Sequence, residues 1–219
     1  MRVHNSRELT QLPYAHRLVA FEGELERDGD HEFAHFDGDA FVESVAGGSA
    51  FTSSAFSSVT FTGGRYRRAR FDDVWLHSVR VVGSDLVDTS WMDAEFAASV
   101  LAGIEAFGAT MRRVVFHHCK FDSVNLRKTR LREVSFVDCL LRDVDLAGAT
   151  LTDVTFPGST LERIRLDNAQ LSRVDLRDAG ALDIASGIDA LRGATIDSAQ
   201  LLDLAPALAQ LLGLIVKDR

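Results

Sequence analysis

The sequence predicts an all-β solenoid, a chain wound into square coils, with a short C-terminal helical segment. Two observations predict it: an apolar residue recurs at every fifth position, and the residue two positions earlier is mostly small or β-branched. The stretch CKFDSVNLRKTRLREVSF (residues 119–136) shows both. Five steps along an α-helix end about 140° from the starting face, and five steps along a strand change sides. Neither regular element buries this pattern, so the backbone must turn in every repeat.

The five-residue phase extends over most of the chain, from Phe36 to Leu201, without a slip. Of its 34 positions, 30 carry Phe, Leu, Ile, Val, Met, Trp or Tyr, and the exceptions are Ala46, Ala106, Ala181 and Ser186. Such a repeat overrides local propensity for helix or strand. We therefore divide the chain into an N-terminal cap (1–33), a β-helix (34–198) and a C-terminal helical cap or dimerisation segment (199–219).

Four such repeats, each turning about 90°, close one square coil, and coils stack about 4.8 Å apart through backbone hydrogen bonds. Residues 20 positions apart should then lie in ladders inside the coil. Phe21 should stack with Phe41 and Phe61, and Cys119 should lie above Cys139 as a buried structural thiol rather than a disulfide partner. The other core positions singled out are Phe36, Phe51, Phe56, Phe71, Phe121, Leu126, Leu131 and Phe136.

Both ends of a solenoid need caps because they expose unpaired strand edges. At the C-terminal end, Gly180 to Ala190 breaks the pattern, and Ser198 is the expected N-cap of a helical segment. That segment is unusually rich in leucine, including Leu201, Leu204, Leu208, Leu211, Leu212 and Leu214. It could cover the last coil only, or it could also form a two-fold dimer contact.

Composition excludes several classes of protein. The 219 residues carry a net charge of −8, which disfavours direct binding to nucleic acid. Two cysteines do not form a disulfide scaffold. The first residues do not have the pattern of a signal peptide, and no stretch approaches the roughly 18 apolar residues of a membrane helix. We expect a cytoplasmic protein that needs neither a membrane nor a cofactor.

No catalytic motif is found, so we do not expect an enzyme. His77 and His117 occupy the same outward position two coils apart, about 10 Å by strand spacing, with His118 beside the second. This distance is too large for both side chains to bind one metal ion directly, so no metal site is predicted. Trp75 also falls at an outward position, where it could contact a partner or pack at the edge of a coil.

One face of the predicted coil is acidic. Residues 36–198 contain 23 acidic and 18 basic residues, far fewer net charges than the ~24 of a duplex about 40 Å long. The face centred on Phe36 and its equivalents is nevertheless −5, and could meet a basic partner or simply be solvated. The acidic residues that we predict to bind a partner are Glu95, Asp138, Asp175, Asp178 and Asp197.

Several repeats resemble the pentapeptide repeat family, whose loose consensus is A(D/N)LXX. They are SDLVD (84–88), VNLRK (124–128), VDLAG (144–148) and VDLRD (174–178). The resemblance implies a right-handed quadrilateral β-helix. Its best understood branch, which includes Qnr-type quinolone-resistance proteins, resembles duplex DNA and binds DNA gyrase or topoisomerase IV. Members of that branch dimerise through the C-terminal end.

The phase does not break between Phe36 and Leu176, so the loops of Qnr-type members are absent unless their length is a multiple of five, and the loopless mycobacterial type is the nearer model. The resemblance therefore implies a partial DNA mimic that shields a topoisomerase from a poison. The alternative is a scaffold that docks an unrelated protein on one flat face. Reversing the charges of the acidic residues would distinguish the two.

Overall fold

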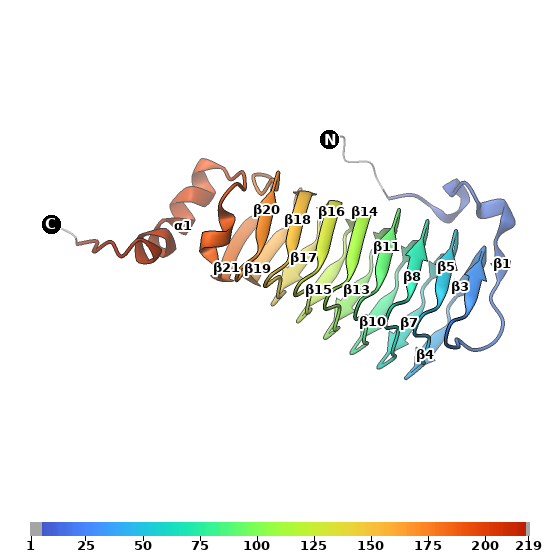
Figure 1. The fold of residues 1–219 in the computed structure, drawn as a ribbon. Helices are drawn as coiled ribbons and strands as arrows, with labels where there is room; N and C mark the ends of the chain where they lie inside the picture. The colour runs from blue at the N-terminus through green and yellow to red at the C-terminus, as the bar shows by residue number, and fades with distance from the viewer. Residues whose placement is uncertain (1–5, 218–219) are drawn as a thin grey trace.

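The computed structural model describes residues 6–217 and confirms the all-β solenoid with one C-terminal helix. The strands stack along one axis, with the N-terminal segment at one end and the helix at the other (Figure 1). Short 3-10 helices lie at both ends, and the helices are η1 (Leu9–Gln11), η2 (Ala15–Arg17), η3 (Ile188–Leu191) and α1 (Ser198–Leu211).

The strands form two parallel sheets that wrap around one core. The 13-stranded sheet contains β1 (Val19–Ala20), β2 (Asp30–Glu32), β3 (Ala34–Asp37), β5 (Ala50–Thr52), β6 (Ala55–Ser57), β8 (Arg70–Asp72), β9 (Trp75–His77), β11 (Ser90–Met92), β12 (Glu95–Ala97), β14 (Thr110–His117), β16 (Arg130–Val137), β18 (Thr150–Thr155) and β20 (Gln170–Ser172). The 8-stranded sheet contains β4 (Ala40–Val42), β7 (Thr60–Thr62), β10 (Arg80–Val82), β13 (Val100–Ala102), β15 (Lys120–Asp122), β17 (Leu140–Arg142), β19 (Thr160–Arg165) and β21 (Ala181–Ser186).

Each coil has four sides. We name one side the β3 face, which continues through β6, β9 and β12 and the second halves of β14 and β16, and another the β4 face, the outer surface of the 8-stranded sheet. A third side consists of β2, β5, β8, β11, the starts of β14, β16 and β18, and β20. Isolated bridges such as Arg65–Asp85 form the fourth. Paired residues of neighbouring coils are 20 positions apart in the sequence along most of the stack, as in Phe41 and Phe61.

The corners are made by a backbone conformation that recurs every fifth residue. A positive φ falls at every such position from Asp28 to Arg173. This left-handed conformation favours Gly, Asn and Asp, and Gly38, Asp88 and Asn168 are examples. None of the corner residues is β-branched, since Val, Ile and Thr tolerate this conformation worst. Each corner directs the next two inward residues back to the core.

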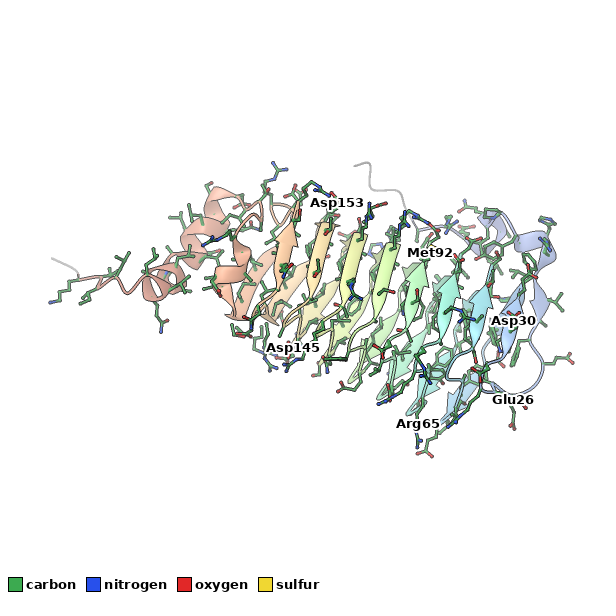
Figure 2. The ribbon with its side chains drawn as sticks, viewed as in Figure 1. Glu26, Asp30, Arg65, Met92, Asp145 and Asp153 are labelled. Carbon is green, nitrogen blue, oxygen red and sulfur yellow. The ribbon has the colours of Figure 1, made fainter. Side chains whose placement is uncertain are left out.

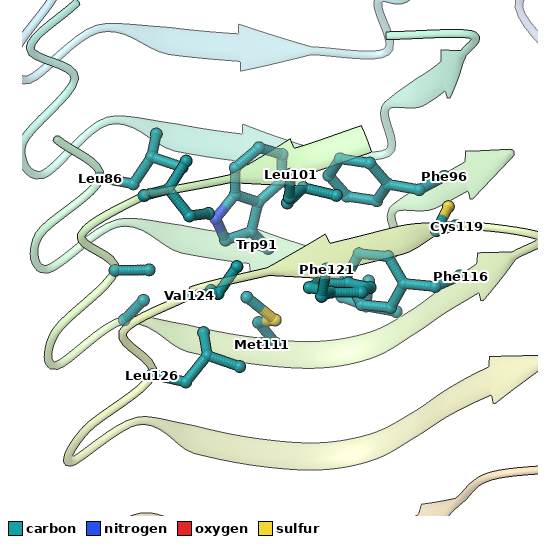
Figure 3. Packing of buried hydrophobic residues seen from close by; sticks show 14 of the residues in the cluster. Leu86, Trp91, Phe96, Leu101, Met111, Phe116, Cys119, Phe121, Val124 and Leu126 are labelled. Carbon is teal, nitrogen blue, oxygen red and sulfur yellow. The ribbon is translucent and has the colours of Figure 1, made fainter. Parts of the chain in front are cut away.

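The core is filled by aromatic and aliphatic side chains, and Figure 3 shows part of it from close by, with Phe96, Phe116 and Leu101 among the labelled residues. Phe36 and Phe56 are both fully buried and stack with ring centroids 4.5 Å apart. Phe51 stacks on Phe71 at 4.8 Å, and Phe41 lies 5.3 Å from Phe61. The remaining core positions named above are also buried: Phe121, Leu126, Leu131 and Phe136.

Buried small polar residues bond to the backbone of the neighbouring coil. Ser54 Oγ accepts from Ala34 N at 3.1 Å, and Ser159 Oγ accepts from Cys139 N at 2.9 Å. Cys119 and Cys139 occupy the same position one coil apart, where both are buried free thiols. Cys119 N donates to Cys139 Sγ at 3.4 Å, so the thiol fills the place of a serine hydroxyl.

The sequence-based register is wrong at both ends of the solenoid. Phe21 does not stack above Phe41, because β1 pairs with β3 at a spacing of 15 and brings Phe21 against Phe36, with centroids 4.4 Å apart. At the other end, β21 pairs with β19 at a spacing of 21, except at Ile164 and Ile184, where the spacing is 20. The five-residue phase therefore slips at Ala181, which is exposed, while Leu182 packs against the core.

The helix α1 begins one residue earlier than expected from its cap. Asp197, not Ser198, is the N-cap: its side chain accepts from Gln200 N at 2.8 Å. Gln200 Oε1 in turn accepts from Asp197 N, and Gln200 Nε2 donates to Leu176 O at 2.7 Å, which ties the helix to the last coils. In the part of the chain that the structure describes, no helix is long and apolar enough to span a membrane.

Candidate protein-binding surfaces

The N-terminal segment covers part of the face that the sequence predicted to be acidic. Residues 6–18, here called the strap, lie across the β3 face as a pair of 3-10 turns. Leu12 and Tyr14 pack on Ala55 and Trp75, and all four side chains are buried. The Trp75 indole donates to Arg7 O at 3.1 Å. Trp75 therefore packs under the strap and is not an exposed contact for a partner.

The strap also removes one of the predicted partner-binding acids from the surface. Glu95 is only 7% exposed, and its carboxylate accepts from both Arg7 N and Arg7 Nε at 2.6 Å. A carboxylate held in this way is satisfied inside the protein. The prediction that Glu95 contributes to an exposed acidic surface is therefore wrong. The sequence contained a signal that this face is covered, because the neighbouring outward residues of the β3 face, Ala55, Trp75 and Ala97, are not charged.

The structure separates the other four predicted acids. Asp175 pairs with Arg177 at 2.6 Å, and the Arg177 guanidinium lowers the pKa of Asp175. Asp197 is engaged as the N-cap of α1. Asp138 is exposed, with His118 Nδ1 at 3.8 Å, and Asp178 is exposed as well. Of the five acids predicted to bind a partner, here called the predicted stripe, only Asp138 and Asp178 in the later coils remain exposed and outside these bonds.

Charges of opposite sign alternate along the corners of the later coils. Arg113 Nε donates to Asp93 Oδ1 at 2.6 Å, one coil below it. Arg163 bonds Asp143, and Arg173 bonds Asp153, across the same 20-residue step. In each pair the hydrogen bond from the guanidinium lowers the pKa of the aspartate. These ladders neutralise much of the body of the solenoid.

The net negative charge of the chain is instead concentrated at the N-terminal end. Residues 18–64, here called the acidic end, contain nine acidic residues and one arginine, a net charge of −8 that equals that of the whole chain. None of these carboxylates forms an ion pair with another described residue. Six of them occupy every second position of one segment and are exposed: Glu22, Glu24, Glu26, Asp28, Asp30 and Glu32. Figure 2 labels Glu26 and Asp30 at this end of the stack.

Three histidines border a cavity of about 720 Å³ between the strap and the β3 face. His117 is 5% exposed, and burial lowers its pKa. His77 stacks on Trp75, with ring centroids 5.3 Å apart, and His118 is exposed beside Asp138. Within residues 6–217, no three His, Cys, Asp or Glu side chains gather closely enough to hold a metal ion.

The C-terminal helix presents leucines to solvent. Of the residues predicted to form a cap or dimer contact, Leu204 is buried and Leu208 is half-buried. Leu201, Leu211, Leu212 and Leu214 are between 49% and 71% exposed. Leu202, Ile215 and Val216 extend this surface. Together these side chains form an exposed apolar surface at the C-terminal end of the described chain.

Comparisons with known proteins agree with the coil geometry. A family model described as pentapeptide repeat region matches residues 109–183. A structure of QnrB1, described as a plasmid-mediated fluoroquinolone resistance protein, is 17% identical, with a TM-score of 0.55 over 92% of this chain and 100% of that chain. HetL from Nostoc sp. strain PCC 7120, described as involved in heterocyst differentiation regulation, is 16% identical, with a TM-score of 0.46 over 80% and 93%.

A search of curated proteins finds no match to this chain. At 17% identity, the likeness to QnrB1 shows the fold and nothing more about this chain. The family match, the period of five residues and the four-sided coils that pair at 20 residues are nevertheless consistent with one another. Residues 109–183 therefore form a pentapeptide repeat region, and the coils before them continue the same geometry.

Proposed function

We propose that this protein binds DNA gyrase or topoisomerase IV as a partial DNA mimic and shields the enzyme from a poison such as a quinolone. It would act in the cytoplasm, without catalysing a reaction and without binding nucleic acid itself. The fold is that of QnrB1, a fluoroquinolone resistance protein. The likeness to QnrB1 makes a topoisomerase the first partner to test.

The observation that carries this proposal is the charge density of the acidic end. Its net charge of −8 falls on residues 18–64. These residues wind into roughly two coils and cover about 11 Å of the axis, over which a duplex carries about six or seven phosphates. The acidic end therefore matches the charge of DNA locally, which the body of the solenoid does not. A basic DNA-binding groove would attract it over several ångströms and speed the encounter.

A homodimer through the C-terminal end is part of this proposal. The exposed leucines of α1 supply an apolar surface on the side of the molecule opposite to the acidic end (Figure 1). A two-fold contact there would place one acidic end at each tip of a long rod. Sedimentation should then give the mass of two chains, and Leu212→Glu should give the mass of one.

The paired charges of the later coils favour the second candidate function, a scaffold that docks an unrelated protein on a flat face. Supercoiling by purified gyrase, with and without a quinolone, separates the two candidates. Under the mimic proposal the wild-type protein should inhibit supercoiling or reduce drug-stabilised cleavage. No effect at tens of micromolar of folded protein would contradict it and favour the scaffold.

Two variants with the same charge change locate the active surface. Glu24→Lys/Glu26→Lys alters the acidic end, whereas Asp138→Lys/Asp178→Lys alters the exposed remnant of the predicted stripe. We expect the first variant to lose its effect on gyrase and the second to keep most of it. The reverse result would restore the stripe as the binding surface.

A further inference from the structure

The first coil of the solenoid lacks one of its four sides. Ala20 pairs with His35, and Asp30 pairs with Ala50. Ten residues separate Ala20 from Asp30 in the first coil, whereas fifteen separate their partners His35 and Ala50 in the second coil. The first coil is therefore shorter by five residues, which is the length of one side. Residues 23–27 cross the gap as a loop without strand pairing, and Leu25 covers the end of the core at 7% exposed.

The missing side leaves β4 as an open edge. Within the described chain, β4 pairs only with β7, and it is the terminal strand of the 8-stranded sheet. Asp39 O and Glu43 N are bonded to Thr60 and Thr62 of the next coil. Alternate residues of a parallel strand direct their backbone groups to opposite sides. The N–H and C=O groups of Ala40 and Val42 therefore point away from the sheet, where no strand meets them.

A groove already exists beside this edge. A cavity of about 700 Å³ lies between the loop at residues 23–27 and β4, and its charged lining residues are Glu24, Glu26, Arg27 and Asp39. Val42 is 70% exposed at its margin. Figure 1 shows β4 at the blue end of its sheet, beside the N-terminal segment. The unpaired backbone groups of β4, the space beside them and the nearby carboxylates therefore lie in one place.

We propose that β4 is a docking edge for an extended, lysine- or arginine-bearing stretch of another protein, about five residues long. Such a stretch would add to the sheet as a strand and supply the missing side of the first coil, the mode of recognition known as β-augmentation. The three carboxylates of the groove, on Glu24, Glu26 and Asp39, outnumber its one guanidinium, on Arg27, and therefore favour a basic segment. A second copy of this chain is disfavoured, because its acidic end would bring the same net charge of −8 to the contact.

This inference concerns how the acidic end binds, and it goes beyond the proposed function because any protein with such a segment could supply the strand. The competing interpretation is protective: charged residues at an open edge prevent pairing between chains. Protection predicts that no peptide binds at β4. Docking predicts that a basic strand binds there and an acidic one does not.

The first experiment uses the full-length protein and fluorescently labelled nine-residue peptides that alternate lysine with valine. Binding is followed by anisotropy at low and physiological salt, together with hydrogen exchange of the Ala40 and Val42 amides. We expect the basic peptide to bind and to slow exchange at these two amides. The matched controls are a peptide with glutamate in place of lysine and a basic peptide N-methylated at alternate amides. Both controls should bind roughly tenfold or more weakly, because they lose charge attraction or strand pairing.

The second experiment changes the edge itself. Val42→Pro removes an N–H that has no partner in the sheet, and proline is tolerated on an edge strand in that orientation. Val42→Thr keeps the N–H and is the control. Docking predicts a roughly tenfold loss of peptide affinity in the proline variant and less than twofold in the threonine variant. Circular dichroism should show that both variants keep their β structure.

Three results would overturn the proposal. Equal binding of the N-methylated peptide, or of Val42→Pro, would show attraction to the acidic end without strand addition. Absence of any peptide binding would leave the acidic residues as protection of the edge. A change of oligomeric state in Val42→Pro alone would identify a second copy of the chain as the occupant. None of these results depends on whether gyrase is the partner.

Discussion

The acidic end and the later coils are built on one backbone plan but differ in charge and in core. Residues 18–64 contain nine acidic residues and one basic, while residues 110–178 contain ten acidic and twelve basic. In the later coils most acids meet a base in the same or the next coil, as Asp143 meets Arg163. In the acidic end they face solvent. A repeat fixes where side chains point, and each coil remains free to choose which charges it presents.

The cores differ in a related way. In the early coils large aromatic side chains alternate with very small residues, as at Gly64 and Tyr66. In the later coils the same pair of positions holds two side chains of intermediate size, as at Val124 with Leu126 and Val144 with Leu146. Both arrangements fill the same cross-section, because packing conserves volume rather than residue type.

The largest effect on stability that would test this difference between the early and later cores is expected at Gly64. A Cβ built there would lie 2.4 Å from Oη and 2.5 Å from Cε2 of Tyr66, whose ring is buried in the core. Gly64→Ala should therefore lower the free energy of unfolding by about 1–3 kcal/mol, the usual cost of overpacking. Chemical denaturation followed by circular dichroism measures it.

The control is Gly64→Ala in a variant that also carries Tyr66→Leu, so that this position holds leucine as in the later coils. In Tyr66→Leu the ring is gone, so Gly64→Ala should cost much less, and the two changes should be coupled by about 0.5–3 kcal/mol. Independent, additive effects would show that Gly64 is required for the backbone and not for the aromatic ring.

A medium effect is expected where the strap covers the β3 face. Arg7→Leu leaves the Glu95 carboxylate, whose side chain is 10% exposed, without its guanidinium partner. Because Arg7 is itself partly in solvent, we expect a loss of about 1–2 kcal/mol. Loosening of the strap would expose Trp75 and shift its fluorescence to longer wavelength, measured in a Trp91→Phe background so that one tryptophan remains.

Arg27→Leu is the matched control for the strap, since Arg27 is exposed and outside the β3 face. It should leave the emission of Trp75 unchanged. If Arg7→Leu also leaves it unchanged, the apolar contacts of Leu12 and Tyr14 are sufficient to hold the strap in place.

The smallest effect concerns the paired charges of the later coils and depends on pH. Arg113 lowers the pKa of Asp93 below its unfolded value of about 3.9. A lowered pKa in the folded state means that the pair stabilises the protein above about pH 4, and that this contribution is lost as the pH falls below it. Thermal unfolding between pH 2 and 7 should therefore be less pH-dependent in Asp93→Asn than in the wild type.

The size of this effect should be below about 1 kcal/mol, because the Asp93 and Arg113 side chains are both more than a third exposed. Glu24→Gln is the control at the acidic end: it removes a carboxylate that has no ion pair and should leave stability within a few tenths of a kcal/mol. An equal response of both variants would show that pairing does not distinguish the two regions.

The sequence by itself determined the coil. A period of five, with inward residues two apart, has one solution in which both stay buried, and the corner residues from Asp28 to Arg173 follow it without interruption. The ladders Phe36–Phe56 and Phe51–Phe71 follow from the same count, because neighbouring coils lie 20 residues apart. The same local pattern is repeated many times, so a departure in one repeat, such as Ala46, does not change the predicted fold.

Only the tertiary structure decided the ends and the surfaces. The strap on Trp75 and Glu95, the missing side beside β4 and the extra residue before Leu182 each depend on a contact made once, between segments that no period relates. The acidic residues were visible in the sequence, but Arg7 is 88 positions from Glu95. Such a pair forms because one segment folds over a particular face, and the energies that select that face come from side-chain packing in three dimensions.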